Sequence, residues 1–566
     1  MAKKVTKAKS PKLATSAVKP TAPDHLTMRL FDPGMSLIHR AGLGGLACTL
    51  KAIERQVKED TLARSALPAP FKDGEPPWEI RGSEITLKFG KPEQAGKYLE
   101  KLFAYGFSIR KNEGLIELRG QYKGEPPRAA LADLQSGLTL TFLQHGKVRQ
   151  LAKEPTQLSY DPESEGVPGI VVQYRKCTGY KHQDSWEDFV DKKGCLTTRN
   201  IKVDGPVCPG TVIRHVAFTG DTAAEDPPSR MLPLVFAMVG CLPLPVNRGV
   251  AALLVPEVEN LLDFVFDRPA MTPITPRDCQ IANAADAAFR AQIRVRDNAA
   301  RNASIATRSR TIGGCYSMTF MPTAWASQQK SRVATIHVPP GDMKLLDRFE
   351  RALANLPPRI AIKTVKESTG KGKQKQTIER NEAFRTDSVV RPLIADNLAN
   401  GRPWYANFVR LMTKTNPATD KPYRNQLSFE RKGLHAMIAD PTMWDQEGEM
   451  LIVKSVHEAI RQSLGRIREE TDGKGAKGLS QATKNRWERF RDKLRIDLAG
   501  AKTQAHVRFA LTDLFSRGGS NSVLKEGWAK VLPVLRSNWQ LARDLGLLAL
   551  ASYAGKGDAK DDEAEL

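Results

Sequence analysis

The end of this chain carries a helical period of apolar residues that short breaks divide into segments. The expected helices span 450–470, 480–499, 503–516, 522–535 and 538–553. The breaks fall at Asp472-Gly473, Gly500 and Gly518-Gly519, and Pro533 helps to end the fourth helix. Connections of this length join antiparallel neighbours, so the pattern is typical of a packed bundle. We predict a C-terminal helical bundle over 441–556 and an acidic tail over 557–566.

A short motif near the N-terminus precedes another expected helix. The turn at 32–34 leads into a helical pattern that continues to about Arg64. Gly42, Gly44 and Ala47 in this pattern fit the G-x-G-x-x-A spacing of dinucleotide-binding loops. Polar residues directly precede them, where such a loop needs a buried apolar strand. We interpret these small residues as sites of close helix packing, and a dinucleotide site is the alternative.

The region that follows mixes strand and helix patterns. Strands are expected at 84–89 and 115–119, one helix between them at 94–105, and buried elements at 231–239 and 250–255. Frequent glycine and proline make the rest of 177–276 irregular. This order predicts an N-terminal α+β domain over 26–275.

A central mixed segment over 276–440 connects the two ends of the chain. Its pattern predicts a helix at 281–302, a strand at 332–338 and a helix at 342–354. Residues 363–375 contain five lysines and no large apolar residue after Val365, which predicts a solvated lysine-rich loop. The predicted fold class is therefore α+β, a mixed N-terminal α+β domain followed by an all-α C-terminal helical bundle.

Charge limits the partners of such a chain. The 566 residues carry a formal net charge of +23, and the sequence pI is about 9.7. A surplus of this size repels itself unless a polyanion neutralises it, and nucleic acid is the first candidate. A membrane partner is not expected, because the longest apolar runs, 231–241 and 250–255, are shorter than the roughly 20 residues that span a bilayer. The seven cysteines include no C-x-x-C pair, which favours a reducing compartment such as the cytoplasm.

The lysine-rich N-terminus is expected to form a flexible basic arm over 1–25. No apolar stretch follows its lysines, so it lacks the form of a secretory signal. A transit peptide is the alternative, although such peptides favour arginine and this stretch contains none.

Basic side chains gather at three places, which we identify as candidate nucleic-acid contacts. They are Arg290, Arg294, Arg296, Arg301, Arg308 and Arg310 in the centre, Lys371, Lys373 and Lys375 in the lysine-rich loop, and Lys484, Arg486, Arg489 and Lys493 in the second bundle helix. Side chains of this kind bind phosphates. The same bundle helix has an apolar stripe that comprises Trp487, Phe490, Leu494 and Leu498. This stripe should face the other helices, so that most of the basic side chains point to solvent. A solvated charged face is the alternative for each cluster.

Nothing local in the sequence points to catalysis, to a metal or to a cofactor. The nine histidines are scattered, and neither H-E-x-x-H nor G-x-S-x-G occurs. A zinc site is an alternative for four residues, Cys177, His182, Cys195 and Cys208. They lack the closely spaced ligand pairs of structural zinc sites, so we interpret the cysteines as buried or surface thiols. An active site assembled from distant residues also stays open as an alternative.

Two terminal segments carry a family resemblance. The first comprises Pro33, Gly34, Met35, His39, Arg40, Ala41, Gly42, Leu43, Gly45 and Leu46, and the second comprises Trp539, Ala542, Arg543, Asp544, Leu545, Leu548, Ala549, Leu550, Ala551, Ser552 and Tyr553. A weaker internal match comprises Pro403, Trp404, Tyr405, Asn407 and Phe408. These segments resemble the Myxan-type (type I-B) large subunit of CRISPR Cascade complexes, the Cas-eight family.

The resemblance implies a non-catalytic role in antiviral defence or in RNA-guided transposition. In such complexes a guide RNA supplies specificity by base pairing, while the large subunit recognises a short motif that flanks the target in double-stranded DNA and supports strand opening; the same division of labour is known for another effector. The implied partners are guide RNA, target DNA, the Cascade backbone and small subunits, and a helicase-nuclease or transposition proteins. The alternatives are a standalone nucleic-acid enzyme such as a nuclease, and a general RNA-binding protein.

Overall fold

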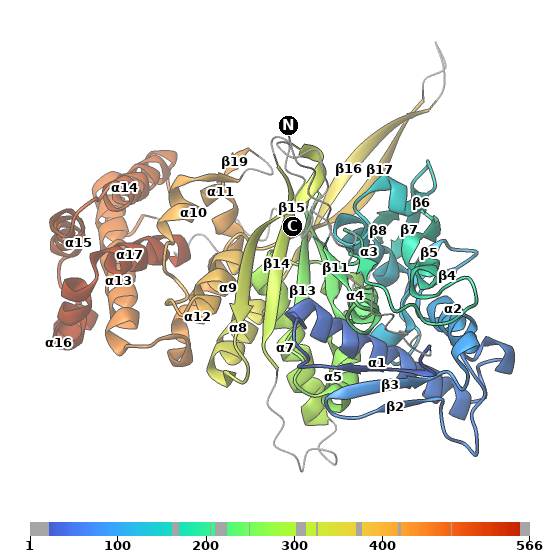
Figure 1. The fold of residues 1–566 in the computed structure, drawn as a ribbon. Helices are drawn as coiled ribbons and strands as arrows, with labels where there is room; N and C mark the ends of the chain where they lie inside the picture. The colour runs from blue at the N-terminus through green and yellow to red at the C-terminus, as the bar shows by residue number, and fades with distance from the viewer. Residues whose placement is uncertain are drawn as a thin grey trace, which may run out of the picture.

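The computed structural model describes residues 22–160, 169–203, 205–209, 224–247, 249–301, 313–323, 326–369, 376–416, 420–476 and 478–554. Figure 1 shows a mixed body of helices and strands formed by the earlier part of the chain, and consecutive helices formed by the later part. This arrangement confirms the predicted fold class.

The first part of the body is built around α1 (Leu37–Lys58). Three antiparallel strands lie beside it in the order β1 (His25–Arg29), β3 (Glu84–Lys88) and β2 (Trp78–Ile80). They are followed by α2 (Ala95–Gly106) and by the antiparallel pair β4 (Ser108–Arg110) and β5 (Leu115–Glu117). The strands predicted at 84–89 and 115–119 and the helix predicted at 94–105 are therefore confirmed.

Helix α3 (Arg128–Leu140) is a second helix in a region where the pattern predicts only one. Ser136, Gly137 and Thr139 lower its intrinsic helix propensity, so propensity does not identify it. Burial stabilises it instead, because α3 packs between β12 (Leu242–Asn247) and β8 (Ile170–Tyr174). Tertiary contacts of this kind are invisible to a local pattern.

The glycines of α1 allow its backbone to lie against α4 (Pro228–Gly240). A Cβ atom on Gly42 would lie 1.8 Å from the carbonyl oxygen of Pro233, and one on Gly45 would lie 2.5 Å from the carbonyl oxygen of Phe236. Both distances are shorter than any side chain tolerates, so only glycine fits. Close helix packing, the preferred interpretation of the small residues in this helix, is therefore confirmed.

A four-stranded antiparallel sheet separates two hydrophobic cores. Its order is β12, β13 (Val250–Pro256), β14 (Cys315–Thr323) and β15 (Ala326–Val338). Alternate residues of β13 enter different cores: Leu253 and Val255 join the N-terminal core, which surrounds α1 and α4, and Ala252 and Leu254 join the C-terminal core, which continues into the bundle. Helix α7 (Ala284–Arg301) covers the C-terminal face of the sheet, and α8 (Met343–Asn355) packs against α7. The central helices, the strand at 332–338 and the buried elements are thus confirmed.

Residues 359–386 form a long hairpin rather than the predicted lysine-rich loop. Strand β16 (Arg359–Thr369) pairs with β17 (Gln376–Thr386) over its whole length, so the prediction of a loop for 363–375 is wrong at least as far as Thr369. Ala383 pairs with Ile170 of β8, and among the described residues the ribbon β16–β17 pairs with no other strand. Figure 1 shows it projecting from the body. Ile362 of this ribbon is 54% exposed, so its apolar residues need not alternate as those of a half-buried strand do, which is why the pattern does not reveal it.

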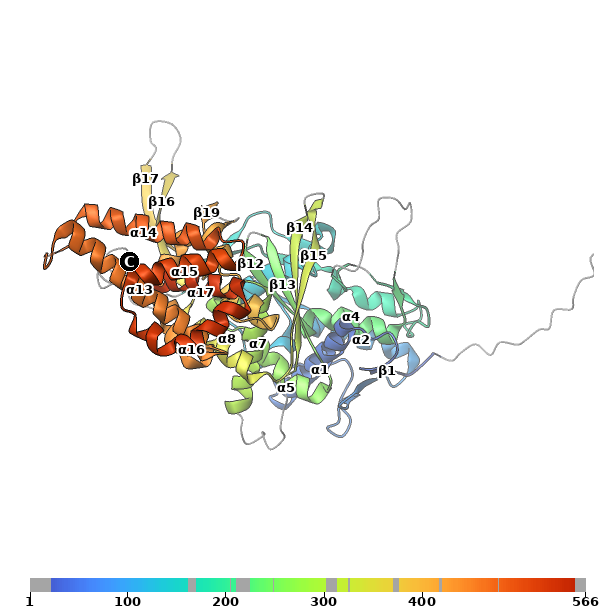
Figure 2. The ribbon, with the colours of Figure 1, turned by 90° about the vertical axis from the view of Figure 1, so that its left-hand side faces the viewer.

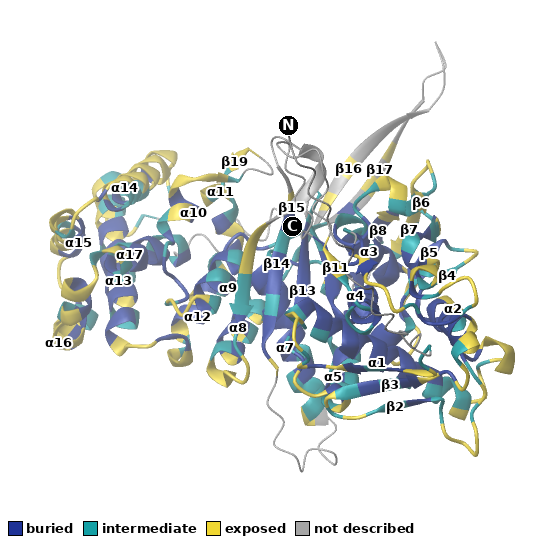
Figure 3. Ribbon diagram, viewed as in Figure 1, coloured by how far each residue is buried: buried dark blue, intermediate teal, exposed yellow. Residues whose placement is uncertain are grey.

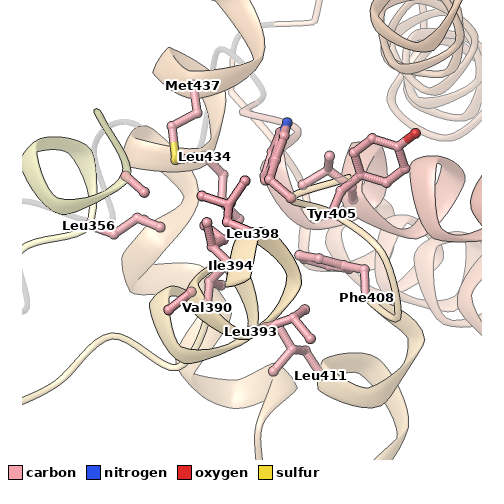
Figure 4. Close-up of a cluster of buried hydrophobic side chains, with 14 of the residues drawn as sticks. Leu356, Val390, Leu393, Ile394, Leu398, Tyr405, Phe408, Leu411, Leu434 and Met437 are labelled. Carbon is pink, nitrogen blue, oxygen red and sulfur yellow. The ribbon is translucent and has the colours of Figure 1, made fainter. Parts of the chain in front are cut away.

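Short helices connect the hairpin to the bundle. They are α9 (Arg391–Ala399), α10 (Val409–Thr413), α11 (Arg424–Leu427) and α12 (Arg431–Ala439). Figure 4 shows how α9 and α12 bring apolar side chains such as Ile394, Leu398 and Leu434 together. This cluster belongs to the C-terminal core, which therefore runs from the sheet to the bundle without a break.

The bundle contains the five predicted helices. They are α13 (Glu447–Asp472), α14 (Gln481–Ala499), α15 (Gln504–Gly518), α16 (Ser522–Ser537) and α17 (Trp539–Ser552). Pro533 lies inside α16 and does not end it, which differs from the prediction. Figure 3 shows α17 buried among the other helices, while α14, α15 and α16 expose one side.

Candidate nucleic-acid interface

Helix α14 presents the predicted basic face. Ser480 caps its N-terminus by accepting a hydrogen bond from the backbone N–H of Thr483 at 3.1 Å. Leu494 and Leu498 are buried in the C-terminal core, and Trp487 donates a hydrogen bond from Nε1 to the carbonyl oxygen of Leu464 on α13 at 3.0 Å. The apolar stripe thus faces the bundle as predicted.

The four predicted bases of α14 are all exposed. Arg486, Arg489 and Lys493 are three and four residues apart, so they share one side of the helix, and Lys484 lies across the apolar stripe from them. The Arg486 guanidinium is 3.0 Å from a carboxylate oxygen of Glu470 on α13. Within the described part of the chain no acid is within ion-pair distance of Arg489 or Lys493. These two cations are the ones most available to a phosphate.

Arg290 has a structural environment. It is 5% exposed on α7, its guanidinium donates to the carbonyl oxygens of Gln280 and Arg277, and Asp286 lies 3.9 Å away. A guanidinium held by carbonyl and carboxylate oxygens cannot reach a phosphate without giving up these bonds. Its burial argues against the predicted role in nucleic-acid binding.

Arg294 and Arg296, on the same helix, are also engaged within the protein. Arg294 donates from Nε to the carbonyl oxygen of Met271 at 3.1 Å, and burial lowers its pKa to about 10. Arg296 is 16% exposed and pairs with Asp297, Asp347 and Glu350 at 2.8 to 3.1 Å. Three carboxylates offset its charge. The central cluster is therefore not a free basic surface over α7.

The other candidates lie at the limits of what the structure describes. Arg301 ends α7, but its side chain lies outside the described residues. Five more candidates, Arg308, Arg310, Lys371, Lys373 and Lys375, also lie outside them. The three predicted clusters are thus not brought together by side chains that the structure describes, and α14 alone presents its bases to solvent.

Exposed aromatic side chains on the neighbouring helices escaped the sequence analysis. Phe509 of α15 is 73% exposed, and Trp528 of α16 is 42% exposed. Phe509 falls off the buried stripe that contains Val507, Leu511 and Leu514, so a helical projection of 504–518 would have identified it. Aromatic rings in solvent can stack on unpaired bases.

The described ranges contain no group of three or more histidine, cysteine, aspartate or glutamate side chains that could hold a metal ion. All seven cysteines are buried, among them Cys177, Cys195 and Cys208. His182 packs between Phe107, Phe142 and Tyr180, and burial lowers its pKa to about 3. None of the described helices has both the length and the apolar character needed to cross a membrane.

The segments that carry the family resemblance have definable structural roles. His39 lies 2.7 Å from the Ser36 hydroxyl and 3.2 Å from a carboxylate oxygen of Asp226, which ties the turn before α1 to the start of α4. In the second half of the chain, Asp544 of α17 is buried and accepts the backbone N–H groups of Asn407 and Val409 at 2.7 and 3.2 Å. Asn407 has a φ of 60°, a left-handed conformation that this contact stabilises. The internal and closing motifs are therefore joined directly.

Comparison with known proteins agrees with these features. The models of the DevT N-terminal domain and the DevT C-terminal domain match residues 27–235 and 440–566. Over 559 residues the chain is 33% identical to the CRISPR-associated protein Cas8a1/Csx13 of Myxococcus xanthus (strain DK1622), an alignment that covers 96% of this chain and 91% of that protein. The chain is thus a CRISPR-associated protein of the Cascade large-subunit class. It belongs to the Cas8 family, in the Myxan type that its terminal segments predict.

Proposed function

We propose that this chain is a non-catalytic large subunit that recognises the motif flanking a target in double-stranded DNA and supports strand opening directed by a guide RNA. The observation that carries the proposal is the likeness to the Myxococcus relative over nearly the whole chain. The net charge of +23 suits a subunit that must neutralise many phosphates. The process served is antiviral defence or RNA-guided transposition, and the expected location is the cytoplasm.

The proposed path of a separated DNA strand follows the bundle. Arg489 and Lys493 would contact phosphates, and the exposed rings of Phe509 and Trp528 would stack on unpaired bases. Figure 1 and Figure 2, which share a vertical axis, show α14 and the hairpin β16–β17 on the upper side of the molecule, and this supports a path along that side. The partners in this proposal are guide RNA, target DNA, the backbone and small subunits of Cascade, and a helicase-nuclease or transposition proteins.

The test uses the chain purified together with its guide RNA and the subunits encoded beside it. Binding of a matched target duplex is measured for the wild type and for the triple variant Arg486→Ala, Arg489→Ala and Lys493→Ala. We expect the variant to bind about tenfold more weakly and to show a shallower dependence on salt, because fewer counterions are released. A control variant with the same loss of charge, Lys432→Ala, Lys454→Ala and Arg461→Ala, should bind as the wild type does.

Three outcomes would contradict the proposal. Unchanged affinity in the α14 variant would remove this face from the DNA path. Magnesium-dependent cleavage by the isolated chain would favour the nuclease alternative. RNA binding that ignores a guide-loaded complex would favour a general RNA-binding protein.

A further inference from the structure

A cavity of about 650 Å³ opens at the root of the hairpin β16–β17. Its wall comes from the residues that follow β17, from α9 and α10, from β18 (Thr415–Asn416) and from α11. Leu393 and Leu411, both labelled in Figure 4, form part of its apolar lining. The volume lies within the range of small-ligand sites, roughly 300 to 1,000 Å³, and is ample for one nucleotide.

One residue of the cavity wall, Gln426, carries a hydrogen-bond acceptor without a donor among the described residues. The side-chain oxygen Oε1 of Gln426 is buried and has no hydrogen-bond partner among the described residues. A buried acceptor left in this way costs about 1 to 3 kcal/mol, so a ligand with an N–H group would gain from binding to it. Asp396 adds a second acceptor: its carboxylate takes one hydrogen bond from Asn283 Nδ2 at 2.8 Å, and burial raises its pKa to about 6.

The rim of the cavity is positively charged. Arg410 and Lys414 lie four residues apart at the two ends of α10, and both are exposed. Neither is within ion-pair distance of an acid in the described ranges. Among the other charged residues of the wall, Arg385 pairs with Asp133 and Asp387 pairs with Arg391, while the carboxylate of Asp396 interacts with the positive charge of Arg410. The two exposed cations outnumber this one carboxylate, so the opening keeps a net positive charge that suits a phosphate.

We propose that this cavity binds a single nucleotide whose base carries an exocyclic amine, as adenine, guanine and cytosine do. The amine donates to Gln426 Oε1 and to Asp396, while the phosphate lies between Arg410 and Lys414. Uracil and thymine present a carbonyl oxygen where cytosine presents its amine, so they would bring an acceptor against an acceptor. The proposal rests on the proposed function, in which the nucleotide comes either from the guide RNA or from an opened DNA strand.

The experiment measures binding of fluorescent tetranucleotides to the full chain, with RNA and DNA series of A, C and U or T. Wild-type protein should bind the A and C tetramers about tenfold more tightly than the U or T tetramer. The rim variant, Arg410→Gln with Lys414→Gln, should weaken every tetramer. Gln426→Met keeps the side-chain volume and should remove the preference for amine-bearing bases. The control variant, Lys432→Gln with Lys454→Gln, has the same loss of charge outside the cavity and should change neither.

The outcomes distinguish guide RNA from an opened DNA strand as the source of the nucleotide, and they distinguish failure of the cavity proposal from failure of the proposed function. Preference in the RNA series alone assigns the site to the guide, and preference in the DNA series alone assigns it to the opened strand. Equal binding of all tetramers by wild type, or a full preference retained by Gln426→Met, overturns the cavity proposal. Guide-directed duplex binding by the wild-type complex is measured in parallel: if it persists while the cavity result is negative, only this inference fails, and if it is absent, the proposed function fails.

Discussion

His457 lies on α13 between the closing helix and a second histidine. Its Nε2 is 3.0 Å from the carbonyl oxygen of Ala549 and 3.0 Å from the hydroxyl of Ser552, and its ring stacks on that of His435 at 5.9 Å. Burial, with a smaller contribution from the charge of His435, lowers its pKa to about 4. The neutral imidazole is therefore the form that the bundle holds, with Nε2–H donating to α17.

The lowered pKa of His457 predicts how the free energy of unfolding changes as the pH falls. The unfolded chain binds the proton near pH 6.5, whereas the folded chain binds it only near pH 4, so stability is lost as pH falls from 6.5 to 4. The contribution is about 3 kcal/mol when complete. Urea unfolding at pH 7 and pH 4.5 should show a smaller difference for His457→Gln, whose amide can still donate to Ala549, than for the wild type. His506→Gln, at an exposed position of α15, is the control. Equal differences for all three proteins would contradict the assignment.

At the scale of elements, the contact between α1 and α4 depends on the absence of side chains. A Cβ on Gly240 would lie 1.8 Å from the carbonyl oxygen of Ala41, which is the reciprocal of the contact at Gly42. The two helices therefore approach through backbone on both sides. Any side chain here must move one helix away from the other, and both belong to the N-terminal core.

Gly42→Ala should destabilise the protein by more than about 3 kcal/mol, because the two helices must separate to admit the methyl group. The matched control is Gly465→Ala in α13, where an added Cβ meets nothing within 4 Å. That substitution should stabilise the protein by about 0.5 to 1 kcal/mol, since alanine favours the helix. Denaturant unfolding of both variants checks the pair. A neutral Gly42→Ala would mean that the helices have room to shift.

Most of the elements that the sequence predicts have one buried face. Helices α13 to α16, α2 and β3 each alternate between core and solvent, so their period identifies them. Continuous apolar residues identify α4, β13 and α17, which are buried more broadly. Ile362 of hairpin β16–β17 is exposed, and α3 is buried on more than one side, so neither element follows the pattern of one buried face. For the candidate site, α14 was predictable for the same reason. The burial of Arg290 and Arg294 was not predictable, because they donate hydrogen bonds to carbonyl groups of residues outside their own helix.

At the scale of the whole molecule, one strand is shared by two cores. Adjacent residues of β13 enter opposite cores, and the C-terminal core reaches from β13 to α17. The bundle is therefore not a separate folding unit within the described part of the chain. The contact of Asp544 with the backbone at 407–409 fastens α17 to the segment before α12.

Phe408→Ala tests this continuity. Phe408 is fully buried in the C-terminal core, so its loss should cost about 3 to 5 kcal/mol. Hydrogen exchange should accelerate in α9 and in the bundle helices α13 and α17 together, while β1 and β3 in the N-terminal core stay closer to their wild-type protection. Acceleration limited to residues near 408 would instead indicate that the bundle unfolds independently.

The length of the hairpin β16–β17 also has a consequence for DNA binding. Each strand has eleven residues, so at about 3.4 Å per residue the paired ribbon is roughly 35 Å long, including the root at which Ala383 pairs with β8. One turn of B-form DNA rises by about the same distance. Since the cavity with Gln426 lies at the near end of this ribbon, a ligand held there and a contact at Thr369 would be spaced by about ten base pairs. In the proposed complex the hairpin would thus span about one helical repeat of a duplex, counted from a fixed origin at its root.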